Sequence, residues 1–225
     1  MSQPKLLLGD KLWFRLESRL LNVLQLALEM MRKTEKSFPV LEDSISRKLD
    51  KYLRKANEQL RPKKMHVEFL PFFQTQNQPD HDMPQDNTAE RKKPDFLWQW
   101  YDESEKVDYK RYKQYAIECK RLGKPKSTFC KHYITEGVCR FINVEHSYSK
   151  HLLSGTMIGY VQSMELKEIL TEVNTEADNS EIPPIQLNSK GWKRNGVSRL
   201  DHELDRPEVP PTPFKLRHLW LDLRV

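Results

Sequence analysis

The chain contains few cysteines and no long uninterrupted apolar run. Both observations limit the classes of protein to which it can belong. Its 225 residues include three cysteines, an odd number that does not pair into a complete disulfide framework. We therefore expect a reducing, cytoplasmic location. The leucine-rich start is interrupted by Arg15, Glu17 and Arg19. For that reason we expect neither a secretory signal peptide nor a transmembrane helix, and no membrane partner.

The sequence also lacks the recognised motifs that read a nucleic-acid sequence. Cys130, His132 and Cys139 are not spaced as in a zinc ribbon or zinc finger, and buried thiols are the simpler interpretation. No helix-turn-helix is found. If the chain binds nucleic acid, its specificity is expected to be low or to be supplied by a partner.

Charge and length indicate a broad class. Lysine and arginine outnumber aspartate and glutamate by 38 to 32, which gives a formal net charge of +6 at pH 7. A positive balance favours a polyanionic partner, although many basic proteins bind none. The length suits one domain with extensions and is sufficient to bury a sizeable core.

Two apolar runs between Pro94 and Lys120 contain the candidate catalytic residues. Side chains on a strand alternate between its faces. In the run YAIECK, Glu118 and Lys120 therefore share one face, roughly 6.5 Å apart along the strand. In the run DFLWQWY, Asp95 stands at the beginning of the strand. The polar segment between the runs predicts antiparallel pairing, which would bring Asp95 near Glu118. The opposite face of the second run holds Tyr115, Ile117 and Cys119.

The acid-any-Lys triplet by itself is weak evidence for a catalytic site. An acid-any-Lys triplet also occurs at residues 90–92, 108–110 and 165–167. Only the stretch from Pro94 to Lys120 combines a Pro-Asp that opens an apolar strand with a triplet that ends the next strand. The context of the triplet therefore carries the prediction.

At Pro94, Asp95, Glu118 and Lys120, the chain resembles the PD-(D/E)XK nuclease superfamily, which has the restriction-endonuclease-like fold. The strict motif covers only residues 94–120, and the order of elements extends the resemblance to about residues 40–170. The resemblance implies an α/β fold with an αβββαβ core and a mixed central sheet. We expect an N-terminal helix before this core and a loop-rich C-terminal extension that ends in a strand.

These expectations divide the chain into three parts. We predict an N-terminal helical extension over residues 1–38, a nuclease core over residues 39–175, and a C-terminal extension over residues 176–225 that packs back on the core. The final strand is expected at an edge of the sheet. The long polar loop 74–93 is expected either to close over a substrate or to be a floppy insertion.

The resemblance also implies a Mg²⁺ site in which Mn²⁺ can substitute. Asp95 and Glu118 would bind the metal through carboxylate oxygens, and the backbone carbonyl of Cys119 would be a further ligand. Lys120 would orient or deprotonate the attacking water and stabilise the transition state. Glu42, on the first core helix, is a fourth candidate for metal binding and catalysis. Alternatively, it is an acid of the first helical turn, where the helix dipole favours negative charge.

Basic side chains that follow the proposed site in the sequence are candidates for contact with a nucleic-acid backbone. A solvated turn is the alternative for this charge run. A second group, Lys190, Lys193 and Arg194 around Trp192, suits a nucleic-acid strand or, alternatively, an anchored loop. The candidates in the first group are Arg121, Lys124, Lys126, Lys131, His132 and Arg140.

The sequence thus predicts a metal-dependent endonuclease that acts on DNA. One alternative is a non-catalytic nucleic-acid- or protein-binding subunit of a larger nuclease or defence assembly, and another is cleavage of RNA by the same machinery. A protein partner or a second copy could dock through the N-terminal helix or the C-terminal strand. The resemblance makes a role in prokaryotic or phage defence, repair or recombination an expectation.

Overall fold

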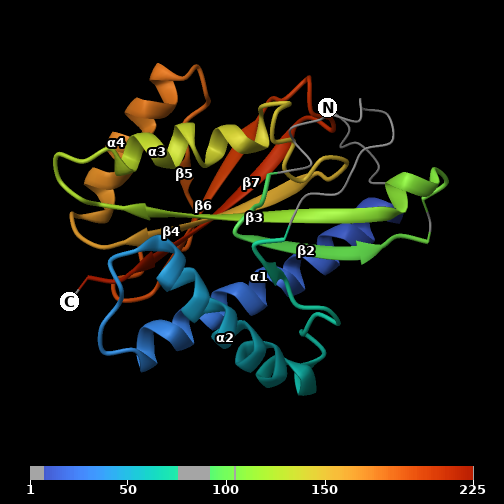
Figure 1. The fold of residues 1–225 in the computed structure, drawn as a ribbon, viewed down its shortest axis with the longest axis horizontal. Coiled ribbons are helices and arrows are strands. Elements are labelled where there is room, and N and C mark those ends of the chain that lie inside the picture. The colour runs from blue at the N-terminus through green and yellow to red at the C-terminus, as the bar shows by residue number, and fades with distance from the viewer. Residues whose placement is uncertain (1–7, 76–91, 104, 225) are drawn as a thin grey trace.

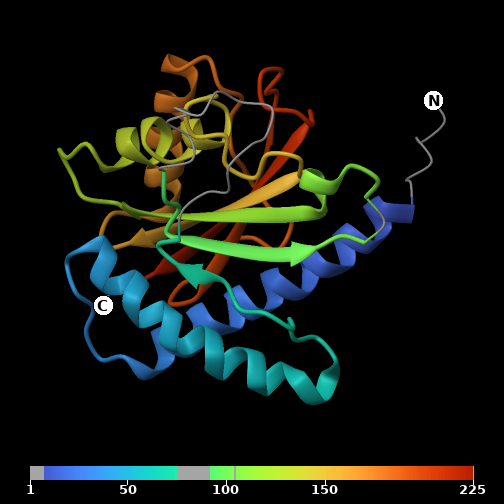
Figure 2. The same ribbon diagram turned by 45° about the vertical axis from the view of Figure 1, so that its right-hand side comes forward.

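The computed structural model describes residues 8–75, 92–103 and 105–224 of the chain. A mixed sheet of seven described strands is covered by two helices on each face (Figures 1 and 2). Helices α1 (Leu8–Thr34) and α2 (Glu42–Leu60) cover one face, and the helices α3 (Phe129–Thr135) and α4 (Leu166–Asn179) cover the other. The predicted α/β class with a mixed sheet is confirmed.

The sheet has a parallel centre and antiparallel flanks. Its order is β1-β2-β3-β4-β7-β6-β5. The pairs β3–β4 and β4–β7 are parallel, and the four outer pairs are antiparallel. The strands are β1 (Phe72–Phe73), β2 (Phe96–Tyr101), β3 (Tyr112–Leu122), β4 (Ser154–Val161), β5 (Gln186–Leu187), β6 (Val197–Leu204) and β7 (Phe214–Asp222).

The first hydrophobic layer lies between the sheet and helices α1 and α2. The leucine stripe of α1 is inaccessible to solvent at Leu20, Leu24 and Leu28, because a helix with apolar residues every three or four positions presents one apolar face. The apolar face predicted for the second run, Tyr115, Ile117 and Cys119, belongs to the same layer. The stripe on α1 is therefore used inside this chain.

The second hydrophobic layer lies between the sheet and helices α3 and α4. Tyr133 of α3 donates or accepts a 2.8 Å hydrogen bond with His218 and receives one of 2.9 Å from Trp220 on β7. Every residue of β4 is buried, as expected for a central parallel strand that is covered on both faces.

The C-terminal third differs most from the expectation. Strand β7 was expected at an edge of the sheet, but it pairs with β4 on one side and β6 on the other. Strand β6 occupies part of the segment that was expected to be an irregular excursion. Because both edges of β7 are paired, they are not free to pair with a strand of a second subunit.

Smaller differences concern the lengths of elements. In the apolar run 66–73, only the two residues of β1 form a strand. The helical segment after β3 is divided at Gly137 into α3 and a 3₁₀ turn, Val138–Phe141. The loop 74–93 lies for the most part outside the described residues, and the boundaries proposed at residues 38 and 175 stay predictions. No helix in the described ranges is long and apolar enough to cross a membrane.

Candidate active site

The candidate site lies where β3 extends beyond its neighbour β2. The last pair of the β2–β3 ladder is Phe96 with Ile117, so the β2 side of β3 has no strand partner after that point. The backbone N–H of Cys119 donates instead to Asp95 Oδ2 at 2.7 Å. The backbone N–H of Arg121 donates to Glu42 Oε2 at 2.9 Å. Two carboxylates thus take over the hydrogen bonds that a neighbouring strand would otherwise make.

Lys120 lies at the centre of the carboxylates that the sequence singled out. Its Nζ lies 2.8 Å from Glu118 Oε1 and 3.1 Å from Glu42 Oε1. The same Nζ donates to the backbone carbonyl of Cys119 at 3.0 Å. The structure therefore brings the four residues Glu42, Asp95, Glu118 and Lys120 to one end of β3, although Glu42 is 78 residues from Lys120 in the sequence.

Arg140 joins this cluster from the 3₁₀ turn Val138–Phe141. Its Nη1 lies 2.5 Å from Glu118 Oε1. The sequence suggested Arg140 as a contact for nucleic-acid phosphate, but the structure directs it to the buried acid. Tyr148 also belongs here, because its backbone N–H donates to the carbonyl of Arg140 at 3.2 Å and its side chain is buried. Tyr148 was not predicted from the sequence.

Burial and crowding of like charges shift the pKa values of the site. Burial, and then the charge of Glu118, raises the pKa of Asp95 to about 8, against the opposing effects of Lys120 and the Cys119 N–H. Burial also raises the pKa of Glu118, although Lys120 and Arg140 oppose the shift. Burial lowers the pKa of Lys120, but the three nearby carboxylates outweigh it, so the net shift is upward. A carboxyl with a pKa of about 8 is largely protonated at pH 7, which relieves the crowding of negative charge in the cluster.

The donor set of this cluster has the chemistry that Mg²⁺ requires, because carboxylate and carbonyl oxygens are hard ligands. Glu118 Oε2 is buried and has no hydrogen-bond partner among the described residues, so one oxygen remains available. A preassembled group of three or more His, Cys, Asp or Glu side chains that could hold a metal ion is not found in the described part of the chain. The ammonium of Lys120 lies between Glu118 and Glu42 and makes the contacts that a cation would make there.

The other predicted nucleic-acid contacts lie mainly on the surface near the end of β3. The guanidinium of Arg121 lies 4.3 Å from the centre of the Phe129 ring and donates to the carbonyl of Val40 at 3.1 Å. Lys124 and Lys126 are exposed on the turn after β3. On α3, Lys131 is exposed, whereas His132 Nε2 lies 3.8 Å from Oε1 of Glu136, the residue that follows the helix.

A buried arginine that the sequence did not indicate anchors the segment that carries Arg140 and Tyr148. Arg206 is inaccessible to solvent, and its guanidinium lies 3.5 Å from the centre of the Phe214 ring. It has no carboxylate partner among the described residues. Its donors instead bind the carbonyls of Phe141, Tyr148, Ser149, Leu152 and Pro211.

The chain matches no protein-family model, no curated protein and no solved structure. The comparisons therefore assign it to no family. The interpretation of the site rests on the positions and chemistry of its own residues.

Proposed function

We propose that this chain is a metal-dependent nuclease that hydrolyses phosphodiester bonds in DNA with Mg²⁺, for which Mn²⁺ can substitute. The observation that supports the proposal is the meeting of Asp95, Glu118 and Lys120 with Glu42 at the end of β3. A metal-binding acid pair with an adjacent lysine is the arrangement expected from the resemblance to the PD-(D/E)XK superfamily. The positive net charge of the chain suits a polyanionic substrate.

Hydrolysis of a phosphodiester requires a positioned water, compensation of charge at phosphorus, and help for the leaving oxygen. Asp95 and Glu118 would hold the metal through their carboxylates, with the Cys119 carbonyl as a further ligand and Glu42 as a fourth. When bound, the metal would supply a Lewis acid for the phosphoryl oxygens and a source of activated water. These are the functions for which hard oxygen donors are required.

Lys120 and Arg140 would act on the substrate side of the reaction. Because its pKa is raised, Lys120 is an ammonium and serves as a hydrogen-bond donor to the attacking water and to a phosphate oxygen. Arg140, which lies on Glu118, would place a second cation where negative charge increases in the transition state. Glu42 would keep the ammonium of Lys120 directed toward the attacking water and the phosphate.

The test is cleavage of supercoiled plasmid and linear DNA in the presence of Mg²⁺, Mn²⁺ or EDTA. Glu118→Gln and Lys120→Met are expected to lower the rate by about 10²-fold or more, because each removes charge that acts on the transition state. Lys167→Ala, in the acid-any-Lys triplet 165–167, and Glu203→Gln are matched controls on exposed residues, and both should cleave at the wild-type rate. Cleavage that survives Glu118→Gln and Lys120→Met, or that persists in EDTA, contradicts the proposal.

One observation favours the alternative of a non-catalytic binding subunit. Lys120 and Arg140 already contact Glu118 Oε1, so the cluster is in part compensated without a metal. The subunit interpretation predicts that DNA binding is unchanged by Glu118→Gln and that no metal supports hydrolysis. A labelled single-stranded RNA in the same assay tests the other alternative, cleavage of RNA by the same machinery. Cleavage of RNA without cleavage of DNA would keep the proposed chemistry and change only the substrate.

A further inference from the structure

A pocket of about 620 Å³ lies at the end of α1, beside the turn that precedes β6. It is lined by Arg32 and Lys33 from the last turn of α1 and by Lys193 and Arg194 from the turn. Glu29 is the acid of this lining, and its Oε1 accepts a hydrogen bond from Gln25 at 2.6 Å. The remaining lining residues are Gln25, Asn195, Gly196 and Val197.

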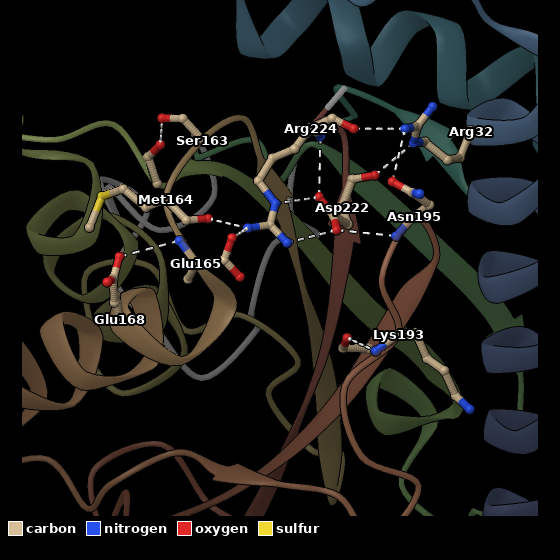
Figure 3. A network of polar contacts seen from close by, with 11 residues as sticks. Arg32, Ser163, Met164, Glu165, Glu168, Lys193, Asn195, Asp222 and Arg224 are labelled. Carbon is tan, nitrogen blue, oxygen red and sulfur yellow. Dashed lines mark hydrogen bonds and ion pairs between the residues drawn. The ribbon is translucent and has the colours of Figure 1, made fainter.

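The walls of this pocket are held in place by a polar network at the end of β7 (Figure 3). Arg224 binds both carboxylate oxygens of Asp222, at 2.8 and 3.0 Å. Asp222 Oδ2 in turn accepts from the N–H of Asn195 at 3.1 Å. Arg32 donates to the side chain of Asn195 at 3.3 Å and to the carbonyl of Asp222 at 2.8 Å. The turn and the end of α1 are therefore fixed to the same strand.

The charge of the pocket is not balanced by its own walls. Arg32 donates to the carbonyls of Asp222 and Arg224 and to the amide of Asn195, all of which are neutral acceptors. Lys33, Lys193 and Arg194 are exposed, and within the described ranges none of the three forms an ion pair with a carboxylate. Four basic side chains thus face one acid in an open pocket, which is the lining that a polyanion requires.

The pocket and the candidate active site lie at the same end of the sheet. Lys120 pairs with Gly159, and Gly159 pairs with Trp220, two residues before Asp222. Two strand spacings and two residues of rise separate the Cα atoms of Lys120 and Asp222 by about 12 Å. Asp222 holds the Asn195 turn of the pocket through the Asn195 N–H, so the pocket lies a short distance along the same end of the sheet from the candidate active site.

The loop between α1 and α2 connects the two places. The carbonyl of Val40 in this loop accepts from Arg121 Nη1 at 3.1 Å and from Gln162 Nε2 at 3.2 Å. The loop therefore crosses the ends of β3 and β4, with the active-site residue Glu42 following it and the pocket residue Lys33 preceding it.

We propose that the pocket lined by Arg32, Lys33, Lys193 and Arg194 binds the phosphodiester backbone of duplex DNA to one side of the scissile bond. This inference rests on the proposed function, because it places the substrate across the active site and the pocket together. Contact is with phosphates and carries no sequence information. Arg32 is the inner contact, held by the network, and the three exposed bases form the outer contacts.

The test compares two triple variants of the full chain by fluorescence anisotropy with a labelled 30-base-pair duplex in EDTA, which prevents cleavage. The pocket variant is Lys33→Ala, Lys193→Ala and Arg194→Ala, and the control removes equally exposed charges on and after α2 by Lys51→Ala, Lys55→Ala and Lys63→Ala. At about 0.9 per phosphate contact, the slope of log K against log salt should fall by about 2.7 in the pocket variant. Its affinity at 100 mM salt should fall by more than about tenfold, and the control should bind as the wild type.

Three results would overturn the proposal: a pocket variant that binds as the wild type, an equal loss in both variants, or displacement of the duplex by poly-aspartate as effectively as by unlabelled DNA. The last result would assign the pocket to acidic protein. The cleavage assay with Glu118→Gln is independent of these measurements. If the wild type cleaves DNA but the pocket variant has the wild-type salt dependence of binding, the pocket proposal alone is refuted. If the salt dependence falls in the pocket variant but the wild type cleaves no DNA, the proposed hydrolysis alone is refuted.

Discussion

Acid should destabilise the fold through His202, a buried histidine far from the proposed site in the sequence. His202 is 4% exposed, and its Nε2 contacts the carbonyl of Pro183 at 2.6 Å, which requires that nitrogen to carry the proton. Its Nδ1 is buried without a partner among the described residues. Burial lowers the pKa of His202 to about 4, against the smaller opposing effect of the Pro183 carbonyl. The folded protein therefore holds the ring in its neutral form.

The direction of this pH effect follows from the number of protons that the folded and unfolded states bind. The unfolded chain, with a histidine pKa near 6.5, binds more protons than the folded chain between about pH 6.5 and pH 4. The free energy of unfolding consequently falls as pH falls through this window. A shift of about 2.5 units corresponds to a limit of about 3 kcal/mol, of which about 2 kcal/mol is lost between pH 7 and pH 5.

Urea unfolding at pH 7 and pH 5 measures this loss in the wild type and in His202→Gln, whose amide can still donate to the Pro183 carbonyl. The difference between the two pH values should be about 2 kcal/mol smaller in the variant. His132→Gln is the matched control, because that ring is partly exposed on α3, and it should keep the wild-type difference. An unchanged pH dependence in His202→Gln would refute the reasoning.

Three further predictions concern stability and are measured by urea or thermal unfolding. Arg206→Met should cost about 3 kcal/mol or more, because it removes the donors of several buried carbonyls; a loss below about 1 kcal/mol would contradict the anchoring role. Gly123→Ala should be strongly destabilising, since φ is +72° and a Cβ would lie 2.0 Å from the Ser163 carbonyl oxygen. Gly191→Ala, with φ +69° and no atom within 4 Å, is its control and should lose only about 1 kcal/mol; equal losses would show that the steric contact is irrelevant. Leu24→Ala in the first hydrophobic layer should cost about 2–5 kcal/mol, and Leu12→Ala, at 52% exposure, should cost far less.

The alternation of side chains was sufficient to predict the strands at the candidate site. The face that holds Tyr115, Ile117 and Cys119 is buried as expected, and Glu118 and Lys120 lie on the other face with their side chains in contact. The period of a strand is local, so a few residues decide it. The position of Glu42 came from the resemblance, because no local pattern shows that the first turn of α2 meets the end of β3.

Less of the fold could be predicted where strand pairing is decided by residues far apart in the sequence. Strand β7 was expected at an edge, but it lies between β4 and β6 and seven of its nine residues are buried. Strand β6 alternates Leu200, His202 and Leu204 toward the core. Its polar residues and the prolines on either side concealed that period. Sheet order depends on contacts over long sequence distances, which a single window does not contain.

The unequal lengths of β2 and β3 have a consequence for how variants of this chain should be chosen. Asp95 and Glu42 are at once candidates for chemistry and the acceptors that complete the hydrogen bonding of β3. Alanine at either position would leave a backbone N–H of the strand without its acceptor, so a slower reaction could reflect a displaced strand end. Asparagine and glutamine keep an oxygen for that N–H and remove only the charge. At this edge, amide substitutions separate chemistry from folding, whereas alanine scanning combines the two.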